Sequence, residues 1–399
     1  MLSEAVRPYI DASVPVLREH GVTITRHFYK SMFEAHPELL NIFNAGNQAS
    51  GVQQQSLATA VFAYAANYRN PDALAPVVER IVHKHASVGI KPEHYPIVGE
   101  HLLGAIKAVL GEAATPELLA AWGEAYGALA DALIAAEKRL YADAGVEAGE
   151  LRSLVVKLIR QESENVKSFY LQMADGHSPG TFQPGQYVSV AVTIDGLRQL
   201  RQYSLSDAPE QPWWRISVKR ENELEPNGKI SNWLHDNLQV GDTLPVSAPF
   251  GDFRPVIDGD KPIALLSAGI GITPMVSVLN TLIARNPNRR VLFAHAARHG
   301  RHHPLRDDVE AARGKLTALT DIQFYEAPNE RDLAGVDYQH RGRMNIDWLQ
   351  LEQLGEVDIY LCGPNGFMRE QWAALTGAGI PPGRIHREVF GPDLLEHLV

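Results

Sequence analysis

Cysteine is nearly absent from this chain, because Cys362 is the only one among 399 residues. A single thiol cannot close an internal disulfide, which is typical of a protein that works in a reducing cytoplasm. An excess of positive charge is also missing: 37 Lys and Arg stand against 47 Asp and Glu, for a formal net charge of −10. Such a surface repels a phosphate backbone, so nucleic acid is excluded as an expected partner.

The chain also lacks an uninterrupted apolar run of membrane-spanning length. Its longest apolar stretch, residues 262–279, contains two glycines, two prolines and polar side chains, which fits a buried strand and turn. Residues 1–10 contain no basic region followed by an apolar run, so no signal peptide is expected. The sequence therefore predicts a soluble, cytoplasmic protein with no membrane span.

The first 142 residues have the period of α-helices. Val22, Tyr29 and Phe33 share one face of a predicted helix, and no strand pattern occurs in this part. Breaks fall at residues 70–71, at 89–92 and at 111–116, where proline and glycine gather. We expect an all-α domain over residues 1–142, followed by a small, acidic, glycine-containing linker over residues 143–150.

Beyond the linker the period changes to two. Apolar residues alternate with small or polar ones over residues 188–194 and 214–219, which predicts an antiparallel β-barrel domain over residues 151–257. Apolar strands then alternate with helical segments, which predicts a parallel α/β domain over residues 258–399. Three domains agree with a length that allows two or three cores.

A glycine-rich turn follows the first strand expected in the α/β domain. It consists of Ala268, Gly269, Ile270, Gly271, Ile272 and Thr273, and Pro274 comes next. The glycines let the backbone approach a pyrophosphate, Thr273 can cap the following helix, and the free N–H groups there attract anions. An ordinary strand-to-helix turn would look the same. Cys362, Gly363 and Pro364 after a second strand end favour a nucleotide site, because ligands bind where such ends converge; Cys362 itself is expected to be a small buried thiol without a redox role.

The run from Arg201 to Ser204 has the residues of a flavin site. Arg201 offers a planar fork for a phosphate, Tyr203 a flat face for an isoalloxazine, and Ser204 a hydrogen bond to the ring edge. By itself the run is better explained as a strand with an exposed arginine and a core tyrosine. Together with the two glycine-containing segments, however, it resembles the ferredoxin–NADP reductase superfamily over residues 150–399.

Four polar residues interrupt apolar stripes in the helical part: Tyr29, Gln53, His85 and Glu137. Burial of such groups is costly without partners, and each alone is most often a satisfied core residue. The neighbouring histidines His83 and His94 weaken an assignment by histidine counting. Together, the four fit a cavity between two helices that clamps a heme, with imidazole as the axial ligand of the iron.

Longer runs make the helical part similar to bacterial flavohemoglobins. These runs are His27-Phe28-Tyr29, His36-Pro37-Glu38-Leu39, Phe43-Asn44, Lys84-His85, Lys91-Pro92 with Tyr95, residues 98–103, and Glu388-Val389-Phe390-Gly391-Pro392 at the other end of the chain. The resemblance spans essentially the whole chain. It implies heme b, FAD and either NADH or NADPH as cofactors, and an NAD(P)H-dependent nitric oxide dioxygenase that converts nitric oxide and O₂ to nitrate.

The same resemblance implies the roles of residues around the heme. His85 is expected to bind the iron, with Tyr95 and Glu137 held against its imidazole; the carboxylate makes the ring more basic and favours O–O activation. Tyr29 is expected to donate a hydrogen bond to bound O₂. The remaining expected members are Phe43, Gln53 and Leu57 in the heme pocket, and Lys84 with Glu388 as a pair that tunes redox potentials; a surface lysine and a surface glutamate are the alternative for that pair.

The resemblance also implies the two nucleotide sites. The FAD site is expected at Tyr187, Arg201, Gln202, Tyr203, Ser204, Ser231, Val389, Phe390, Gly391 and Pro392. The NAD(P) site is expected at Ala268 through Thr273 and at Cys362, Gly363 and Pro364. The small-molecule partners would be O₂, NO and NAD(P)H, with lipid or azole ligands also admitted to the distal pocket, and the chain would be a monomer.

Two other classes of protein stay open. A heme-based gas-binding sensor would need an output element, which the sequence does not contain in a visible form. A heme-free flavin reductase whose α domain docks a partner would lack a Soret band. The choice between NADH and NADPH is open as well, because Arg298 and Arg301 could meet a 2′-phosphate or be solvated loop charges.

Overall fold

The structure is a computed structural model that describes residues 2–43, 48, 51–222 and 228–391. It divides into two compact units. The first is built on Met1–Leu151, with Ser189–Arg201 and Gly391–Val399; the second comprises Arg152–Val188 and Gln202–Phe390.

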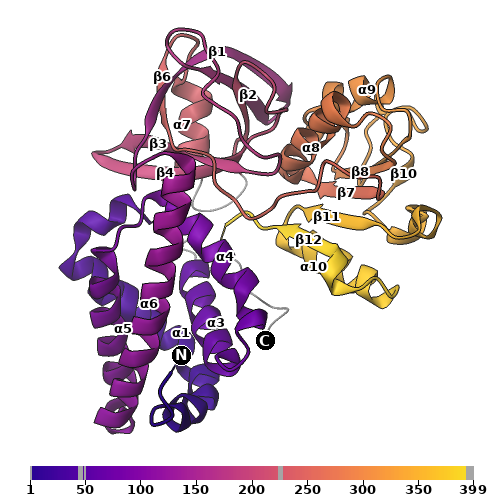
Figure 1. Cartoon of the computed structure of the whole chain (residues 1–399). Coiled ribbons are helices and arrows are strands. Elements are labelled where there is room, and N and C mark those ends of the chain that lie inside the picture. The colour runs from indigo at the N-terminus through magenta and orange to yellow at the C-terminus, as the bar shows by residue number, and fades with distance from the viewer. Residues whose placement is uncertain (1, 44–47, 49–50, 223–227, 392–399) are drawn as a thin grey trace. The chain divides into compact units, whose positions relative to one another are not determined.

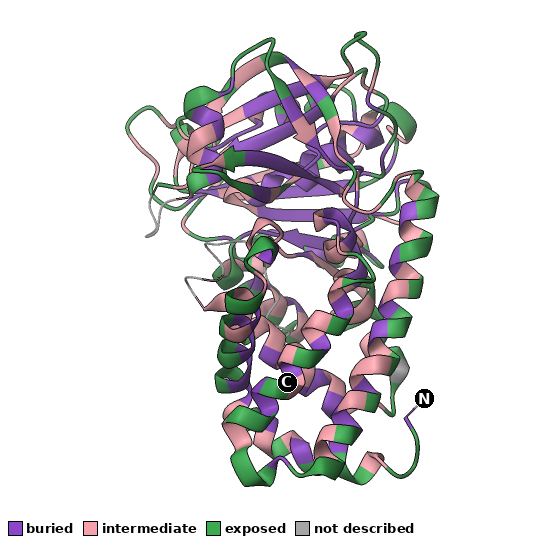
Figure 2. Cartoon of the chain, turned by 90° about the vertical axis from the view of Figure 1, so that its left-hand side faces the viewer, coloured by how far each residue is buried: buried purple, intermediate pink, exposed green. Residues whose placement is uncertain are grey.

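The first unit is helical up to residue 144. Its elements are α1 (Arg7–Ala35), η1 (Pro37–Asn41), α3 (Val52–Asn67), α4 (Pro71–Val88), α5 (His94–Leu110), η2 (Gly111–Ala113) and α6 (Pro116–Ala144). Buried residues form stripes along these helices (Figure 2), and they meet in a core that includes Phe28, Met32, Ile106 and Trp122. The predicted all-α segment is confirmed.

Helix ends fall where the sequence breaks the helical pattern. Thr115 accepts the backbone N–H of Leu118 at 3.2 Å and so caps the start of α6. Gly89 ends α4 with a φ of +78°, a conformation that favours glycine. A Cβ on Gly89 would lie 2.5 Å from the Cα of Gly149, so the turn after α4 also needs glycine for close approach to the linker.

Helix α6 is long and apolar enough to cross a membrane by length and composition alone. The same criteria are met by core helices of globular proteins. Here Trp122, Ala125 and Leu133 of α6 are buried against other helices, so packing accounts for part of the apolar character of α6.

An antiparallel sheet follows. Its strands are β1 (Arg152–Ser163), β2 (Val166–Gln172), β3 (Tyr187–Ile194), β4 (Leu197–Ser204), β5 (Trp214–Lys219) and β6 (Thr243–Val246), in the order β4-β3-β6-β1-β2-β5, and α7 (Lys229–Asn237) lies between β5 and β6 in the chain. An antiparallel bridge between Leu205, just after β4, and Ile216 of β5 links the two ends of this order. The predicted antiparallel β domain is confirmed.

The alternating pattern that predicted β5 does not produce a solvent-facing side. Arg215 and Ser217 are 3% and 2% exposed, and the strand is buried along almost its whole length. Burial is possible because the polar groups are paired: the Ser217 hydroxyl lies 2.7 Å from that of Ser168 and 2.8 Å from that of Ser206. The polar positions of β5 therefore form an internal network.

The last part is a parallel sheet between helices, as predicted. Its elements are β7 (Ile263–Ala268), η3 (Gly269–Gly271), α8 (Ile272–Arg285), β8 (Val291–Ala297), η4 (Gly300–His302), α9 (Arg306–Arg313), β9 (Leu319–Tyr325), β10 (His340–Arg341), η5 (Ile346–Trp348), η6 (Leu351–Leu354), β11 (Asp358–Cys362), α10 (Asn365–Gly377), η7 (Pro382–Arg384) and β12 (Ile385–Glu388). The strand order is β10-β9-β8-β7-β11-β12. Ile263 and Leu265 pack with α8 and α9, whereas Ala264 and Leu266 pack on the side of α10 (Figure 1).

Candidate active site

Three helices of the first unit bring His85, Tyr95 and Glu137 together. The Nδ1 atom of His85 lies 2.8 Å from Oε1 of Glu137, and the Tyr95 hydroxyl donates to the same oxygen at 2.6 Å. Nδ1 of His85 and the Tyr95 hydroxyl are 3.1 Å apart. Burial, with the hydrogen bond to the carboxylate, raises the pKa of Tyr95 far above its usual value, so the hydroxyl stays a donor.

This arrangement determines which nitrogen of His85 is available to a ligand. A carboxylate accepts only, so Nδ1 carries the proton that it donates to Glu137, and Nε2 keeps its lone pair. The Glu137 side chain is 3% exposed whereas that of His85 is 34% exposed, so the far side of the imidazole is accessible. The three residues fit a heme site in which His85 would hold the heme through Nε2 and Glu137 would orient the imidazole.

Two tyrosines that the sequence did not single out support the same helices. The Tyr126 hydroxyl donates to the carbonyl oxygen of Tyr95 at 2.6 Å, and the Tyr141 hydroxyl donates to that of Ile90 at 3.0 Å. Burial raises the pKa of both hydroxyls, so both remain donors. Tyr141 lies four residues after Glu137 on α6, and this helical spacing is the signal that could have identified it.

In the larger core cluster of the first unit, Tyr29 lies among aromatic rings. Its ring centroid is 5.8 Å from that of Phe33 and 5.8 Å from that of Phe43. Burial raises the pKa of Tyr29 to about 12, and a hydrogen bond with the side chain of Gln53 opposes this increase. Leu57, one turn beyond Gln53 on α3, is half-buried against the same core. The structure thus groups Tyr29 of α1 and Phe43, just after η1, with Gln53 and Leu57 of α3.

We expect Glu137→Gln to slow heme-dependent turnover by about 10-fold while heme stays bound, because outer partners of a metal-binding imidazole typically contribute 10- to 100-fold. Glutamine keeps the size of Glu137 but not its charge, so it holds the N–H of His85 less strongly. Turnover and heme content measured together test this. Asp131→Asn, on the exposed face of α6, is the control; equal effects of the two variants would exclude a role for the carboxylate.

In the second unit, Ser204 and Tyr187 lie beside each other where β4 ends and β3 begins. The backbone N–H of Leu205, next to Ser204, donates to the carbonyl oxygen of Gln186 at 2.9 Å. Both side chains are buried, at 5% exposure. The Ser204 hydroxyl has no hydrogen-bond partner among the described residues, which suits a polar ring edge of a bound flavin.

The other expected flavin residues are distributed over several elements. Ser231 lies in the first turn of α7, where its hydroxyl accepts the N–H of Glu221 at 3.2 Å. Tyr203 is half-buried and Gln202 is exposed, while Arg201 groups with the first unit and its guanidinium donates to the carbonyl oxygen of Leu200. Beyond β12 the expected residues are a half-buried Val389, Phe390 with 40% exposure and an exposed Gly391; Pro392 lies outside the described residues.

The two glycine-containing segments meet at one edge of the parallel sheet. Ser267 and Cys362 are register partners at the ends of β7 and β11. A Cβ on Gly271 would lie 2.3 Å from the carbonyl oxygen of Cys362, and one on Gly363 would lie 3.2 Å from the Cβ of Ala268. Ala268 through Ile272 and Cys362 through Pro364 therefore form one continuous backbone surface, which a nucleotide can approach closely.

Thr273 does not cap α8, contrary to the prediction. It is the second residue of that helix, and its hydroxyl donates to the carbonyl oxygen of Ile270 at 2.9 Å. A short 3₁₀ turn over Gly269–Gly271 precedes α8, so the chain is already helical before Thr273. The hydroxyl thus stabilises the turn, and the backbone N–H groups are left for an anion.

Cys362 and Glu388 are buried neighbours on β11 and β12. Burial, followed by the charge of Glu388, raises the pKa of the Cys362 thiol, so a thiolate is disfavoured. Glu388 is 6% exposed and is not the surface residue of the alternative interpretation. In the first unit the Lys84 ammonium donates to the carbonyl oxygen of Gly391; the redox-tuning role of Lys84 and Glu388 stays a prediction.

The fold and the site together define a heme-type globin fused to a flavin- and nicotinamide-dependent oxidoreductase module. Three protein families match the chain: Globin over residues 26–133, the oxidoreductase FAD-binding domain over residues 153–254, and the oxidoreductase NAD-binding domain over residues 265–372. The chain is 50% identical over 399 residues to a flavohemoprotein of Chromobacterium violaceum, with 98% of both chains covered. It is 47% identical over 401 residues to one of Rhizobium meliloti, with 99% of both covered. The chain belongs to the flavohemoprotein family.

Solved structures agree with this membership. A flavohemoglobin from Malassezia yamatoensis with bound FAD and heme matches 98% of this chain and 100% of its own, with a TM-score of 0.86 and 32% identity. The flavohem-like FAD/NAD-binding domain of a nitric oxide dioxygenase from Vibrio cholerae matches 61% of this chain and 100% of its own, with a TM-score of 0.55 and 37% identity. The predicted family, fold class and oxidoreductase type are confirmed.

Proposed function

We propose that this flavohemoprotein is an NAD(P)H-dependent nitric oxide dioxygenase that uses FAD and heme b. The observation that carries the proposal is the buried Glu137 carboxylate, which receives hydrogen bonds from both His85 and Tyr95. An oxygen carrier has no need of a charged group that strengthens its axial imidazole, whereas O–O chemistry does. The fused nucleotide-binding module supplies the reducing equivalents.

The atoms and electrons of this reaction balance with the cofactors that the chain would bind. When bound, FAD splits a hydride into single electrons, and heme supplies the redox centre where O₂ and nitric oxide combine. Each nitric oxide takes both atoms of one O₂ and one electron to become nitrate, so one NAD(P)H serves two turnovers. His85 would hold the heme, Ser204 and Tyr187 the flavin, and residues 268–272 with 362–364 the dinucleotide.

Residues of the helical core set the polarity of the distal side. Tyr29 is buried, and its pKa of about 12 keeps its hydroxyl protonated at physiological pH, so it can donate a hydrogen bond to a diatomic ligand. Gln53 holds this hydroxyl, and Phe43 and Leu57 provide apolar surroundings that suit uncharged gases. The same surroundings would admit lipid or azole ligands, which a titration followed by the heme spectrum would detect.

Tyr29→Phe should lower the rate of nitrate formation by roughly 10- to 100-fold, since it removes a donor aimed at developing charge. The folded-state pKa of Tyr29 lies above the ordinary value of 10.0, so the protonated hydroxyl persists as the pH rises and its contribution is lost only near pH 12. The ratio of wild-type to variant rates should thus stay constant between about pH 6 and 10. Tyr9→Phe, at an exposed position of α1, is the control. A ratio that collapses within this range would contradict the assignment.

The test of the function is direct. Purified protein mixed with NADH or NADPH, O₂ and nitric oxide should form nitrate, with about one nucleotide oxidised for two nitrates formed, as the electron balance above requires. Protein produced without heme is the control. Nitrate no higher than in that control would overturn the proposal. Comparing the two nucleotides also determines the preferred one.

An absorption spectrum tests the two remaining classes of protein. A heme-free flavin reductase would show flavin bands without a Soret band, even when produced with ample heme. A gas sensor would bind heme and O₂ without consuming NAD(P)H. Under the proposed function, adding NAD(P)H without air should reduce first the flavin and then the heme.

The chain acts as a cytoplasmic monomer without a membrane span under this proposal. The single cysteine and the net charge of −10 support a soluble protein in a reducing compartment. Sedimentation of the purified holoprotein, and its recovery in the soluble fraction without detergent, would test both statements.

A further inference from the structure

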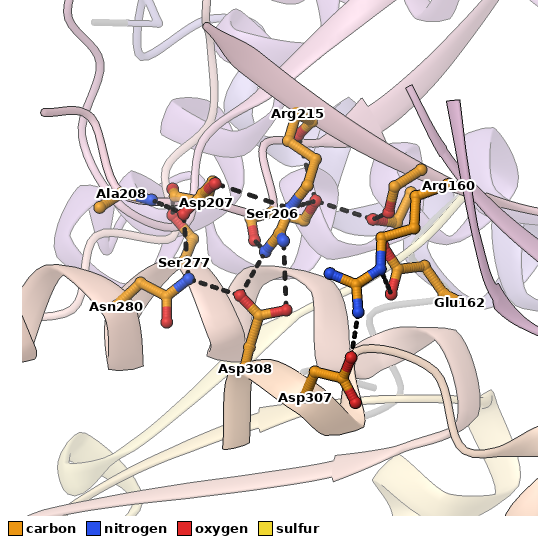
Figure 3. Close-up of polar contacts among 12 residues, drawn as sticks. Arg160, Glu162, Ser206, Asp207, Ala208, Arg215, Ser277, Asn280, Asp307 and Asp308 are labelled. Atoms are coloured by element: carbon orange, nitrogen blue, oxygen red, sulfur yellow. Dashed lines mark hydrogen bonds and ion pairs between the residues drawn. The ribbon is translucent and has the colours of Figure 1, made fainter. Parts of the chain in front are cut away.

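A buried ion pair connects the flavin-binding barrel to helix α9 of the nucleotide domain within the second unit. The guanidinium of Arg215, on β5, binds both carboxylate oxygens of Asp308, on α9, at 2.9 and 3.1 Å (Figure 3). The Arg215 and Asp308 side chains are 3% and 12% exposed. These two residues are 93 positions apart in the chain and come from different domains.

The same guanidinium also holds the chain directly after the flavin motif. Its Nε donates to the Ser206 hydroxyl at 3.2 Å, and another of its N–H groups donates to the Ser206 carbonyl oxygen. Ser206 is two residues beyond Ser204. Arg215 thus binds the segment just after β4, which carries the flavin motif, and also binds α9.

A second set of contacts reaches the helix that begins at the nucleotide loop. The Ser277 hydroxyl donates to the backbone carbonyl of Asp207 at 2.8 Å. The Asn280 amide donates to the carboxylates of Asp207 at 2.9 Å and Asp308 at 2.8 Å, and so bridges them (Figure 3). Ser277 and Asn280 lie on α8, which starts at Ile272 next to the Gly269–Gly271 turn.

We propose that four residues position the nucleotide loop, Gly269–Gly271, against the flavin. These residues, which we name the interdomain clasp, are Arg215, Asp207, Asn280 and Asp308. Arg215 and Asp308 act as positioning residues for hydride transfer. This inference rests on the proposed function. A buried ion pair adds little stability compared with apolar residues of similar volume, but its bidentate geometry specifies one orientation. Hydride transfer depends steeply on such orientation, because a displacement of about 1 Å can cost 100-fold in rate.

A neighbouring ion pair provides a matched control. Asp307, adjacent to Asp308 on α9, pairs with Arg160 of β1, so this pair also crosses from the barrel to the nucleotide domain. Its side chains are 41% and 65% exposed, and exposed pairs contribute little. Asp307→Asn and Asp308→Asn therefore make the same chemical change at adjacent residues and differ in burial and bidentate contact.

The experiment is anaerobic reduction of the flavin by NADH and by NADPH in the holoprotein, followed by stopped-flow absorbance. We expect Asp308→Asn to lower the limiting rate constant by on the order of 10-fold. The nucleotide concentration for half-maximal rate and the FAD content should change little, and the primary isotope effect with nucleotide deuterated at the transferred position should stay equal or increase. Asp307→Asn should remain within about twofold of wild type.

Arg215→Lys is the second variant, because lysine keeps the charge but cannot form hydrogen bonds with Ser206 and Asp308 at the same time. It should slow hydride transfer as Asp308→Asn does, and the double variant should be no slower than either, since the residues act as one unit. Equal rates in Asp308→Asn and Asp307→Asn, or a decrease that follows loss of FAD, would overturn the inference and leave a structural role. An unaltered protein whose flavin neither nucleotide reduces would instead overturn the proposed function.

Discussion

Replacing His85 with alanine should abolish nitrate formation and leave reduction of the flavin by NAD(P)H intact. The Nδ1 atom of His85 lies 2.8 Å from Glu137, so under the proposed function Nε2 is the nitrogen that would bind the heme. Alteration of outer partners of a metal ligand costs 10- to 100-fold, so removal of the ligand itself should cost more than about 100-fold. Flavin reduction should persist because Tyr187 and Ser204 belong to the second unit.

His94→Ala provides the control, since His94 is a half-buried histidine close in sequence. Its Nδ1 accepts the backbone N–H of Lys91 at 3.1 Å and is thereby committed to the turn before α5. Burial is the main cause of the lowered pKa of His94, which keeps this ring neutral. Nitrate formation, heme content and flavin reduction should be measured on both variants. Full nitrate formation by His85→Ala, or equal loss in both, would contradict the assignment of the axial ligand.

Periodicity was sufficient to predict the order of the three folds, because it depends on local burial. The helical period ends near residue 142 and α6 ends at Ala144, and the parallel strands at residues 263 and 291 begin where their apolar runs begin. The site in the helical part was harder to predict from the sequence pattern. Glu137 interrupts an apolar stripe, but local pattern does not indicate its contact with Tyr95, 42 positions away; the family resemblance implied that contact, and the packing of α5 on α6 produces it.

Long-range polar contacts explain most of what the sequence could not predict. Arg215 stands in an alternating strand and looks like a solvent-facing charge, yet it is buried because Asp308 neutralises it. Glutamate is usually found at the surface, yet Glu388 is buried beside Cys362 because β12 pairs with β11. In both cases the deciding partner is distant in the chain, and local pattern carries no information about it.

Gly271→Ala should lower the efficiency of flavin reduction by NAD(P)H by about 100-fold, because it forces apart the two segments expected to hold the nucleotide. The φ of Gly271 is −62°, which alanine adopts without strain, so only space is at issue. A Cβ there would lie 2.3 Å from the carbonyl oxygen of Cys362 and 2.7 Å from the backbone nitrogen of Gly363. Backbone atoms cannot yield as a flexible side chain can, so the turn after β7 and the end of β11 must move apart, at a cost of about 1 to 3 kcal/mol.

Gly366→Ala adds the same methyl group close by and isolates this steric effect. Gly366 lies in the first turn of α10, and a Cβ there meets nothing within 4 Å. Alanine in a helix is favoured over glycine by roughly 0.5 to 1 kcal/mol, so this variant should be as stable as the parent or slightly more stable, with unchanged kinetics. The two proteins should be compared by anaerobic flavin reduction over a range of nucleotide concentrations and by thermal unfolding. Because hydride must cross from a nucleotide held at this edge of the sheet, normal reduction kinetics in Gly271→Ala would place the nucleotide elsewhere.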